Sequence, residues 1–175
     1  IIESLNWRYA TKKFDSNRKL SENQINTLKN AFNLTASSYG LQPIKLLVIS
    51  SQEIKNSLLE SSMNQEQIVP CSHLLVICIE SSINEAYIES YFKRVTDIRQ
   101  TPAKILNSFK KSITNEFNDM TNNSIINWSI NQAYLALGNL MTVCSVEGID
   151  SCPMEGFLPE KYDEILDLKS KNLKS

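Results

Sequence analysis

Residues 126–144 read INWSINQAYLALGNLMTVC, and apolar side chains recur in them at helical spacing over a wide face. The positions of this pattern are Ile126, Ile130, Ala133, Tyr134, Leu137, Leu140, Met141 and Cys144. We predict a long central core helix that stops at Gly148. A helix that is apolar on nearly all sides must be covered everywhere, and a chain of 175 residues can do this by self-association. The pattern therefore favours a homodimer.

Two segments at opposite ends of the chain have the composition of binding loops. Residues 152–157, Cys-Pro-Met-Glu-Gly-Phe, follow the predicted helix directly. Proline fixes one dihedral angle, and glycine lets a backbone amide approach a ligand closely. Residues 7–14, Trp-Arg-Tyr-Ala-Thr-Lys-Lys-Phe, place Arg8 and Lys12 four positions apart beside aromatic side chains.

The rest of the chain alternates helical patterns with two short apolar runs. Residues 21–24 form a capping box, residues 50–53 cap a second helix, and Pro102 is expected at the first position of a third. Residues 45–50 and 73–79 are predicted strands. Because neither strand alternates in polarity, we expect both to be central and covered on both faces. These elements predict an α+β fold with a small sheet flanked by helices.

Composition narrows the domain organisation and the class of partner. The 18 basic and 19 acidic residues nearly balance, which argues against nucleic acid or anionic lipid and favours a small molecule. No apolar stretch approaches the ~20 residues that span a bilayer, and no signal peptide is evident, so we expect a cytoplasmic protein. The four cysteines are far apart, lie mostly in apolar runs and are expected to pack as small hydrophobes. Without repeats or linkers, residues 1–175 are predicted to be one domain that ends in a polar stretch, residues 168–175.

Several familiar chemistries lack the residues that they need. The single histidine, His73, heads an apolar strand, and we interpret it as structural, satisfying a backbone group. It has neither a second histidine nor a nearby cysteine with which to bind zinc, so we expect no metal site. A serine or cysteine nucleophile would need the same histidine as its base. The four glycines form neither a Gly-x-Gly-x-x-Gly motif nor a Walker loop.

A flavin site remains compatible with these residues. Flavin mononucleotide (FMN) needs a cation for its phosphate, and a fixed positive charge near N1 and O2 favours the reduced ring. The planar fork of Arg8 suits the phosphate, and the compact charge of Lys12 suits the ring. The alternative interpretation is that both are solvated charges at a helix end.

Residues 7–14 and 152–157 together resemble two segments of the flavin-dependent nitroreductase family, and the resemblance extends from Ile1 to about Leu168. It implies a nitroreductase-like three-layer sandwich. Such a fold has a small central mixed or antiparallel sheet, flanking helices and a long buried central helix, in an obligate homodimer. The FMN-binding residues that the resemblance implies are Arg8, Ala10, Thr11, Lys12, Ser37, Ser38, Gln42, Asn64, Gln67, Gln132, Pro153, Glu155 and Gly156.

The resemblance also implies roles for these residues. Arg8 would serve the phosphate and ribityl end, Lys12 would face the ring, and the backbone amides of residues 153–156 would meet N5 and O4. The loop of residues 37–42, together with Gln132, matches positions near the partner subunit's flavin. Asn64 and Gln67, ahead of the second strand, match positions that hydrogen-bond the pyrimidine part of the ring.

Three departures from the family pattern modify these expectations. Ala10 stands where many members have a serine that helps to hold the phosphate. Gln67 stands where related enzymes often have a lysine, so we expect a flavin that is somewhat harder to reduce. The family usually continues with a further strand and a tail carrying basic residues for the phosphate, neither of which is found within residues 1–175.

The implied reaction is a ping-pong hydride transfer from NADH or NADPH, through flavin N5, to a nitroaromatic, a quinone or a similar flat acceptor. No catalytic side chain is obligatory, because the ring carries the chemistry. Phe109, Phe117 and residues 87–101 are candidate lids, or they simply pack the exterior.

Other functions stay open at this point. Within the same fold, the chain could be a dihydropteridine reductase, a dehalogenase or a flavin-fragmenting enzyme. It could instead bind flavin for storage or regulation without turnover. A third alternative is a helical interaction protein without a cofactor.

Overall fold

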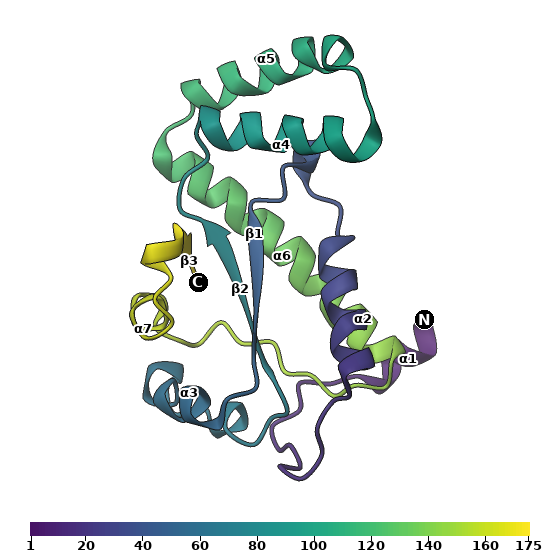
Figure 1. Cartoon of the computed structure of the whole chain (residues 1–175). Coiled ribbons are helices and arrows are strands. Elements are labelled where there is room, and N and C mark those ends of the chain that lie inside the picture. Colours follow the sequence, from purple (N-terminus) through teal and green to yellow (C-terminus); the bar gives the residue numbers. More distant parts are fainter.

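The computed structural model describes all residues, 1–175, and contains seven α-helices and one three-stranded antiparallel sheet (Figure 1). The helices are α1 Ile2–Trp7, α2 Glu22–Asn33, α3 Gln52–Ser57, α4 Glu85–Arg99, α5 Ala103–Asp119, α6 Asn122–Val146 and α7 Pro159–Ile165. The strands are β1 Ile44–Ile49, β2 Leu74–Glu80 and β3 Leu173–Lys174. The predicted α+β class is confirmed. None of the helices combines the length and apolar character needed to cross a bilayer.

The sheet has β2 in its centre, paired with β1 on one side and β3 on the other. Ile44 of β1 pairs with Ile79, and Leu173 of β3 pairs with Glu80. The expectation of two central strands is therefore wrong for β1, which is an edge strand of this sheet. Its apolar run reflects packing on both faces, with Ile44 and Leu46 in one core and Leu47 and Ile49 in the other, and such packing does not require a neighbouring strand on each side.

Helices cover both faces of the sheet. Because successive side chains of a strand point to opposite faces, Leu75, Ile77 and Ile79 pack toward α2 and α6. Val76 and Cys78 pack on the other face, in a core that includes residues near α3 and α7. The central strand thus packs against an apolar core on each face, which explains why its sequence shows no alternation of polarity.

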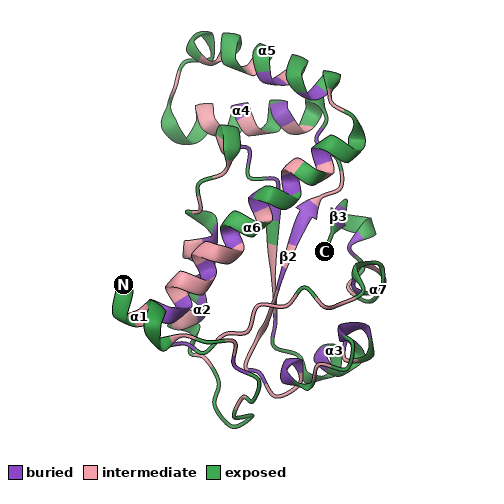
Figure 2. Cartoon of the chain, turned by 180° about the vertical axis from the view of Figure 1, so that it is seen from behind, coloured by how far each residue is buried: buried purple, intermediate pink, exposed green.

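Helix α6 is the long central helix that the sequence predicts, and it begins four residues before Ile126. Thr121 caps its start by accepting a hydrogen bond from the Ser124 amide at 3.2 Å. It ends near Gly148, as predicted, where a φ of +64° suits glycine. Figure 2 shows buried and exposed residues along this helix, so one chain covers it only in part.

Helices α4 and α5 pack on each other and extend beyond the sheet (Figure 1). Helix α4 was not predicted from the sequence, although Asn84 caps it by accepting from the Tyr87 amide at 3.0 Å. Pro102 is the N-cap residue of α5 and not its first helical residue, so the helix begins one residue later than expected, at Ala103. Phe117 is buried in the core of this region, so its interpretation as a lid is wrong, whereas Phe109 stays partly exposed.

The last residues form structure that their polar composition did not predict. Leu168 and Leu173 are buried in the core beneath the sheet, and Leu173 belongs to β3. The Ser175 amide donates to the Asp163 carboxylate at 2.7 Å, which ties this segment to α7. Two buried leucines therefore anchor a stretch that otherwise reads as a polar tail.

Candidate functional site

The two predicted binding segments lie side by side, although about 140 residues separate them. Ala10 and Ser151 form a parallel β-bridge, and the Thr11 amide donates to the Ser151 carbonyl at 3.2 Å. The Thr11 hydroxyl, which is buried, donates to the Asp150 carboxylate at 3.2 Å. Lys12 Nζ lies 3.4 Å from Cys152 Sγ. The structure therefore places a lysine ammonium beside the start of the loop at residues 152–156.

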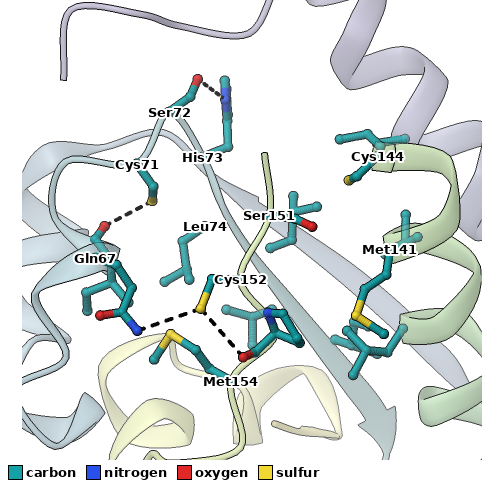
Figure 3. A pocket seen from close by; sticks show the side chains of 18 of the residues that line it. Gln67, Cys71, Ser72, His73, Leu74, Met141, Cys144, Ser151, Cys152 and Met154 are labelled. Atoms are coloured by element: carbon teal, nitrogen blue, oxygen red, sulfur yellow. Dashed lines mark hydrogen bonds between the residues drawn. The ribbon is translucent and has the colours of Figure 1, made fainter. Parts of the chain in front are cut away.

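This loop borders a cavity of about 890 Å³. Of the predicted site residues, Gln67, Pro153 and Glu155 line the cavity, and Ala133 and Tyr134 of α6 form part of its wall. Figure 3 shows Cys152 between Gln67 and Met154, with Met141 and Cys144 of α6 on the opposite side. The cavity is thus lined by elements from three distant parts of the sequence.

The backbone amides of the loop are free. None of the N–H groups of Met154, Glu155 and Gly156 donates to a protein acceptor. Within and after the loop, Phe157 donates to the Glu155 carbonyl at 2.9 Å, and Leu158 donates to Ser61 at 2.8 Å. Met154 and Gly156 are half-buried and Glu155 is exposed, so these three consecutive donors beside the cavity are available to an acceptor-rich ligand.

Side chains from other elements hold the loop in place. Gln65 Nε2 donates to the Gly156 carbonyl at 2.7 Å, and Gln67 Nε2 donates to Gln65 Oε1 at 3.0 Å. On the α6 side, the Tyr134 hydroxyl donates to the Glu155 carboxylate, and this hydrogen bond raises the pKa of Tyr134. Gln65 was not among the predicted site residues, although it lies in the polar segment of residues 64–67 ahead of β2.

Arg8 carries an unsatisfied donor. It follows α1 as the C-cap residue, and its Nε atom is buried without a hydrogen-bond partner. A buried guanidinium N–H that lacks an acceptor costs free energy, and an anion at this position would remove that cost. The predicted phosphate-binding residue therefore has donor capacity that the protein itself does not use.

A second group of predicted residues lies where the loop of residues 37–42 contacts α6. The Ser38 amide donates to Gln132 Oε1 at 2.8 Å, and Gln132 Nε2 donates to the Trp128 carbonyl at 3.1 Å. Ser37 Oγ accepts from the Gln42 amide at 3.1 Å. None of Ser37, Ser38, Gln42 and Gln132 lines the cavity of this chain. The buried Gln132 thus joins the loop of residues 37–42 to α6.

Asn64 differs from the other predicted residues because it is exposed and its side chain makes no hydrogen bond. Its backbone has a φ of +54°, a left-handed conformation that asparagine tolerates better than most residues. The structure therefore gives Asn64 a local reason to be asparagine that is independent of any ligand.

The histidine and the cysteines have structural surroundings. His73 Nδ1 pairs with the Ser72 hydroxyl at 2.8 Å rather than with a backbone group, which corrects the expected partner, and burial lowers the pKa of His73. All four cysteines are free thiols. Burial raises the pKa of Cys78 to about 12 and that of Cys144 to about 11. No three side chains of His, Cys, Asp or Glu gather where they could hold a metal ion.

Comparison with known sequences finds a consistent group of relatives. The model of the nitroreductase family matches residues 5–174. A Bacillus subtilis protein, provisionally named NAD(P)H nitroreductase YfkO, is 34% identical over 173 residues, which cover 94% of this chain and 76% of the relative. A Staphylococcus saprophyticus protein, provisionally named NAD(P)H nitroreductase SSP0379, is 35% identical over 164 residues, covering 90% of this chain and 74% of the relative.

Solved structures share the fold at lower sequence identity. A Staphylococcus epidermidis protein, described provisionally as an NAD(P)H:FMN oxidoreductase, has a TM-score of 0.89 at 22% identity, covering 99% of this chain and 81% of the other. An Exiguobacterium sibiricum protein, described provisionally as a nitroreductase, has a crystal structure in complex with FMN. It has a TM-score of 0.84 at 20% identity, covering 95% of this chain and 79% of the other.

Proposed function

The chain belongs to the nitroreductase family, and on that premise we propose that it is an FMN-dependent NAD(P)H oxidoreductase. The names of its relatives and the FMN complex of a structural neighbour support this proposal. The observation that carries it in this chain is the loop of residues 152–156, which borders the cavity, has three backbone amides without a protein acceptor, and places Cys152 Sγ 3.4 Å from the Lys12 ammonium.

The donors of the site fit the chemistry of FMN. The unsatisfied Nε of Arg8 suits a phosphate oxygen, because a guanidinium binds oxyanions through charge-assisted hydrogen bonds. The free amides of Met154, Glu155 and Gly156 suit the ring carbonyl oxygens and N5. The exposed ammonium of Lys12 supplies a positive charge near the same loop. We therefore assign phosphate binding to Arg8 and ring binding to Lys12 and the loop.

Bound FMN would supply the redox chemistry, accepting hydride at N5 from NADH or NADPH and passing two electrons to a flat acceptor such as a quinone or nitroaromatic in a ping-pong cycle. The residues of this chain orient the ring and fix the charges around it. Gln67 is neutral where related enzymes often have lysine. We therefore expect a reduction potential below that of relatives with two cations beside the ring, because one charge that would stabilise the reduced ring is missing.

We also propose that the site is completed in a homodimer. Helix α1 has no buried residue, and Ile1, Ile2 and Trp7 are largely exposed. Ile130 and Leu135 of α6 are also exposed, although this helix is the central one of the fold. A second subunit packed against α1 and α6 would cover these side chains, and it would bring the loop of residues 37–42 toward the partner's flavin.

The proposal is tested by purifying the chain and recording its visible spectrum. We expect a yellow protein, or a colourless one that takes up added FMN, and we expect anaerobic NADH or NADPH to bleach the flavin. Uptake of FMN without bleaching would instead indicate a storage protein. A protein that neither carries FMN nor binds it would refute the proposal.

A further inference from the structure

We infer that Gln65 is a positioning residue that holds the loop of residues 152–156 in its ligand-binding conformation. The inference rests on the proposed function, because it concerns how the same loop is kept ready for FMN. Gln65 lies outside the loop and acts on it through two hydrogen bonds, one to the Gly156 carbonyl and one from Gln67. Neither the sequence pattern nor the family resemblance had assigned it a role.

The backbone of Gln65 is fixed before its side chain reaches the loop. Its amide donates to the Ser62 carbonyl at 3.0 Å, and its carbonyl accepts from the Ile68 amide at 3.3 Å. Gln65 is also the N-cap residue of the 3₁₀ helix Glu66–Ile68. Met63 and Asn64, just before it, both have left-handed φ values of +54°. The tight turn therefore presents the Gln65 side chain from a rigid base.

The orientation of the Gln65 amide group is defined by its two partners. Its Oε1 accepts from Gln67 Nε2 at 3.0 Å, so its Nε2 is the atom that faces the Gly156 carbonyl, at 2.7 Å. Gln67 is only 7% exposed, and its Nε2 also lies 3.8 Å from Cys152 Sγ. One chain of contacts therefore joins residue 156, near the end of the loop, to residue 152 at its start.

The loop depends on this support because it makes few hydrogen bonds of its own. A bond from the Phe157 amide to the Glu155 carbonyl is its only internal backbone bond. Gly156 leaves space for the approach of Gln65, since a Cβ atom at this position would lie 3.0 Å from Gln65 Nε2. Without the glutamine donor, the Gly156 carbonyl loses its partner, and the free amides of residues 154–156 lose their fixed directions.

Two substitutions separate the parts of this role. Gln65→Glu keeps the size of the side chain and its acceptor for Gln67 but removes the donor to Gly156. Gln65→Met removes both hydrogen bonds at similar volume. Glu66→Gln is the matched control, because Glu66 lies on the same 3₁₀ helix, is exposed and makes no side-chain hydrogen bond. A net hydrogen bond contributes about 1 kcal/mol, so both Gln65 variants should bind FMN about fivefold more weakly, with no change for Glu66→Gln.

A readout that does not involve flavin comes from Cys152, the one cysteine of the chain that is not buried. In the FMN-free protein, a thiol reagent should modify Cys152 faster in both Gln65 variants than in the wild type, because the loop is less ordered. We also expect the visible spectrum of bound FMN to change in the Gln65 variants while their thermal stability stays the same. This combination would separate a positioning role from a general loss of fold. Cys152→Ser identifies the labelled site.

The outcomes distinguish the inference from the proposed function. If the wild type binds FMN and both Gln65 variants match it in FMN affinity and Cys152 labelling, the positioning role is wrong and the flavin function stands. If the wild type does not bind FMN, the proposed function is wrong. The labelling rates of the FMN-free proteins then decide by themselves whether Gln65 orders the loop.

Discussion

Among the predicted site residues, Arg8 has the surroundings that most directly indicate a bound anion. Its Nε is buried and has no acceptor in the protein, whereas most buried donors are satisfied. The spacing of Arg8 and Lys12 was readable from the sequence, but the unsatisfied donor was not, because it depends on how the end of α1 packs. The structure therefore turns a weak sequence signal into a specific expectation about an anion.

We predict that Arg8→Gln weakens FMN binding and leaves riboflavin binding unchanged. A hydrogen bond to a charged group contributes about 1.5–3 kcal/mol, so the FMN dissociation constant should rise roughly 10- to 100-fold. Riboflavin lacks the phosphate and should not sense the change. Fluorescence titration with both compounds measures this difference.

The control for this experiment is Arg99→Gln, which removes an exposed arginine at the end of α4. It should leave both affinities unchanged. Equal losses of FMN and riboflavin affinity in Arg8→Gln would mean that Arg8 supports the fold of the site and does not bind the phosphate.

At the scale of elements, local signals predicted what short-range physics determines. The Ser21 capping box is present, with Ser21 accepting from the Gln24 amide at 3.3 Å, and α6 follows its apolar period. The two-residue β3 has no periodicity that could announce it. The contact between Gln65 and Gly156 joins residues 91 positions apart, and nothing local in the sequence encodes such a distance.

The buried thiols of Cys78 in β2 and Cys144 in α6 make the free energy of unfolding depend on pH in the alkaline range. Burial raises the pKa of Cys78 to about 12 and that of Cys144 to about 11, from an ordinary value of 9.0. Below pH 9 both thiols are protonated in the folded and unfolded states, and their contribution to stability is fully present. Above pH 9 the unfolded chain loses these protons first, so this contribution is lost as the pH rises toward 11–12.

We therefore predict that the free energy of unfolding falls between about pH 9 and pH 11, by about 1.4 kcal/mol per pH unit for each thiol at most. Urea unfolding at a series of pH values measures the slope. The double variant Cys78→Ala and Cys144→Ala should show a shallower decline, measured against its own stability near pH 8. An unchanged slope in that variant would assign the alkaline loss to other groups.

At the scale of the whole molecule, one chain leaves part of its central helix uncovered. Ile130 and Leu135 are 36% and 55% exposed, and α1, which packs against the C-terminal end of α6, has no buried residue (Figure 2). The sequence suggested a helix that needs covering on every side, and the fold of a single subunit does not provide this. The family resemblance assigns Ser38 and Gln132 to the partner's flavin. Ser38, in the loop of residues 37–42, donates its amide hydrogen to Gln132 on α6, and neither residue lines the cavity of its own chain.

We predict that Leu135→Glu, at an exposed position of α6 that does not line the cavity, weakens dimerisation and lowers FMN content together. A glutamate buried without a partner in an interface costs about 3 kcal/mol, which corresponds to roughly hundredfold weaker association. Ile54→Glu on α3 is the control, because Ile54 is also an exposed apolar residue, at 37%, but lies on the opposite side of the sheet from α6 (Figure 1). Sedimentation equilibrium and the absorbance of bound flavin measure both effects. A wild type that sediments as a monomer would contradict the proposed dimer. A Leu135→Glu variant that stays dimeric with full FMN would show that this face of α6 is not the interface.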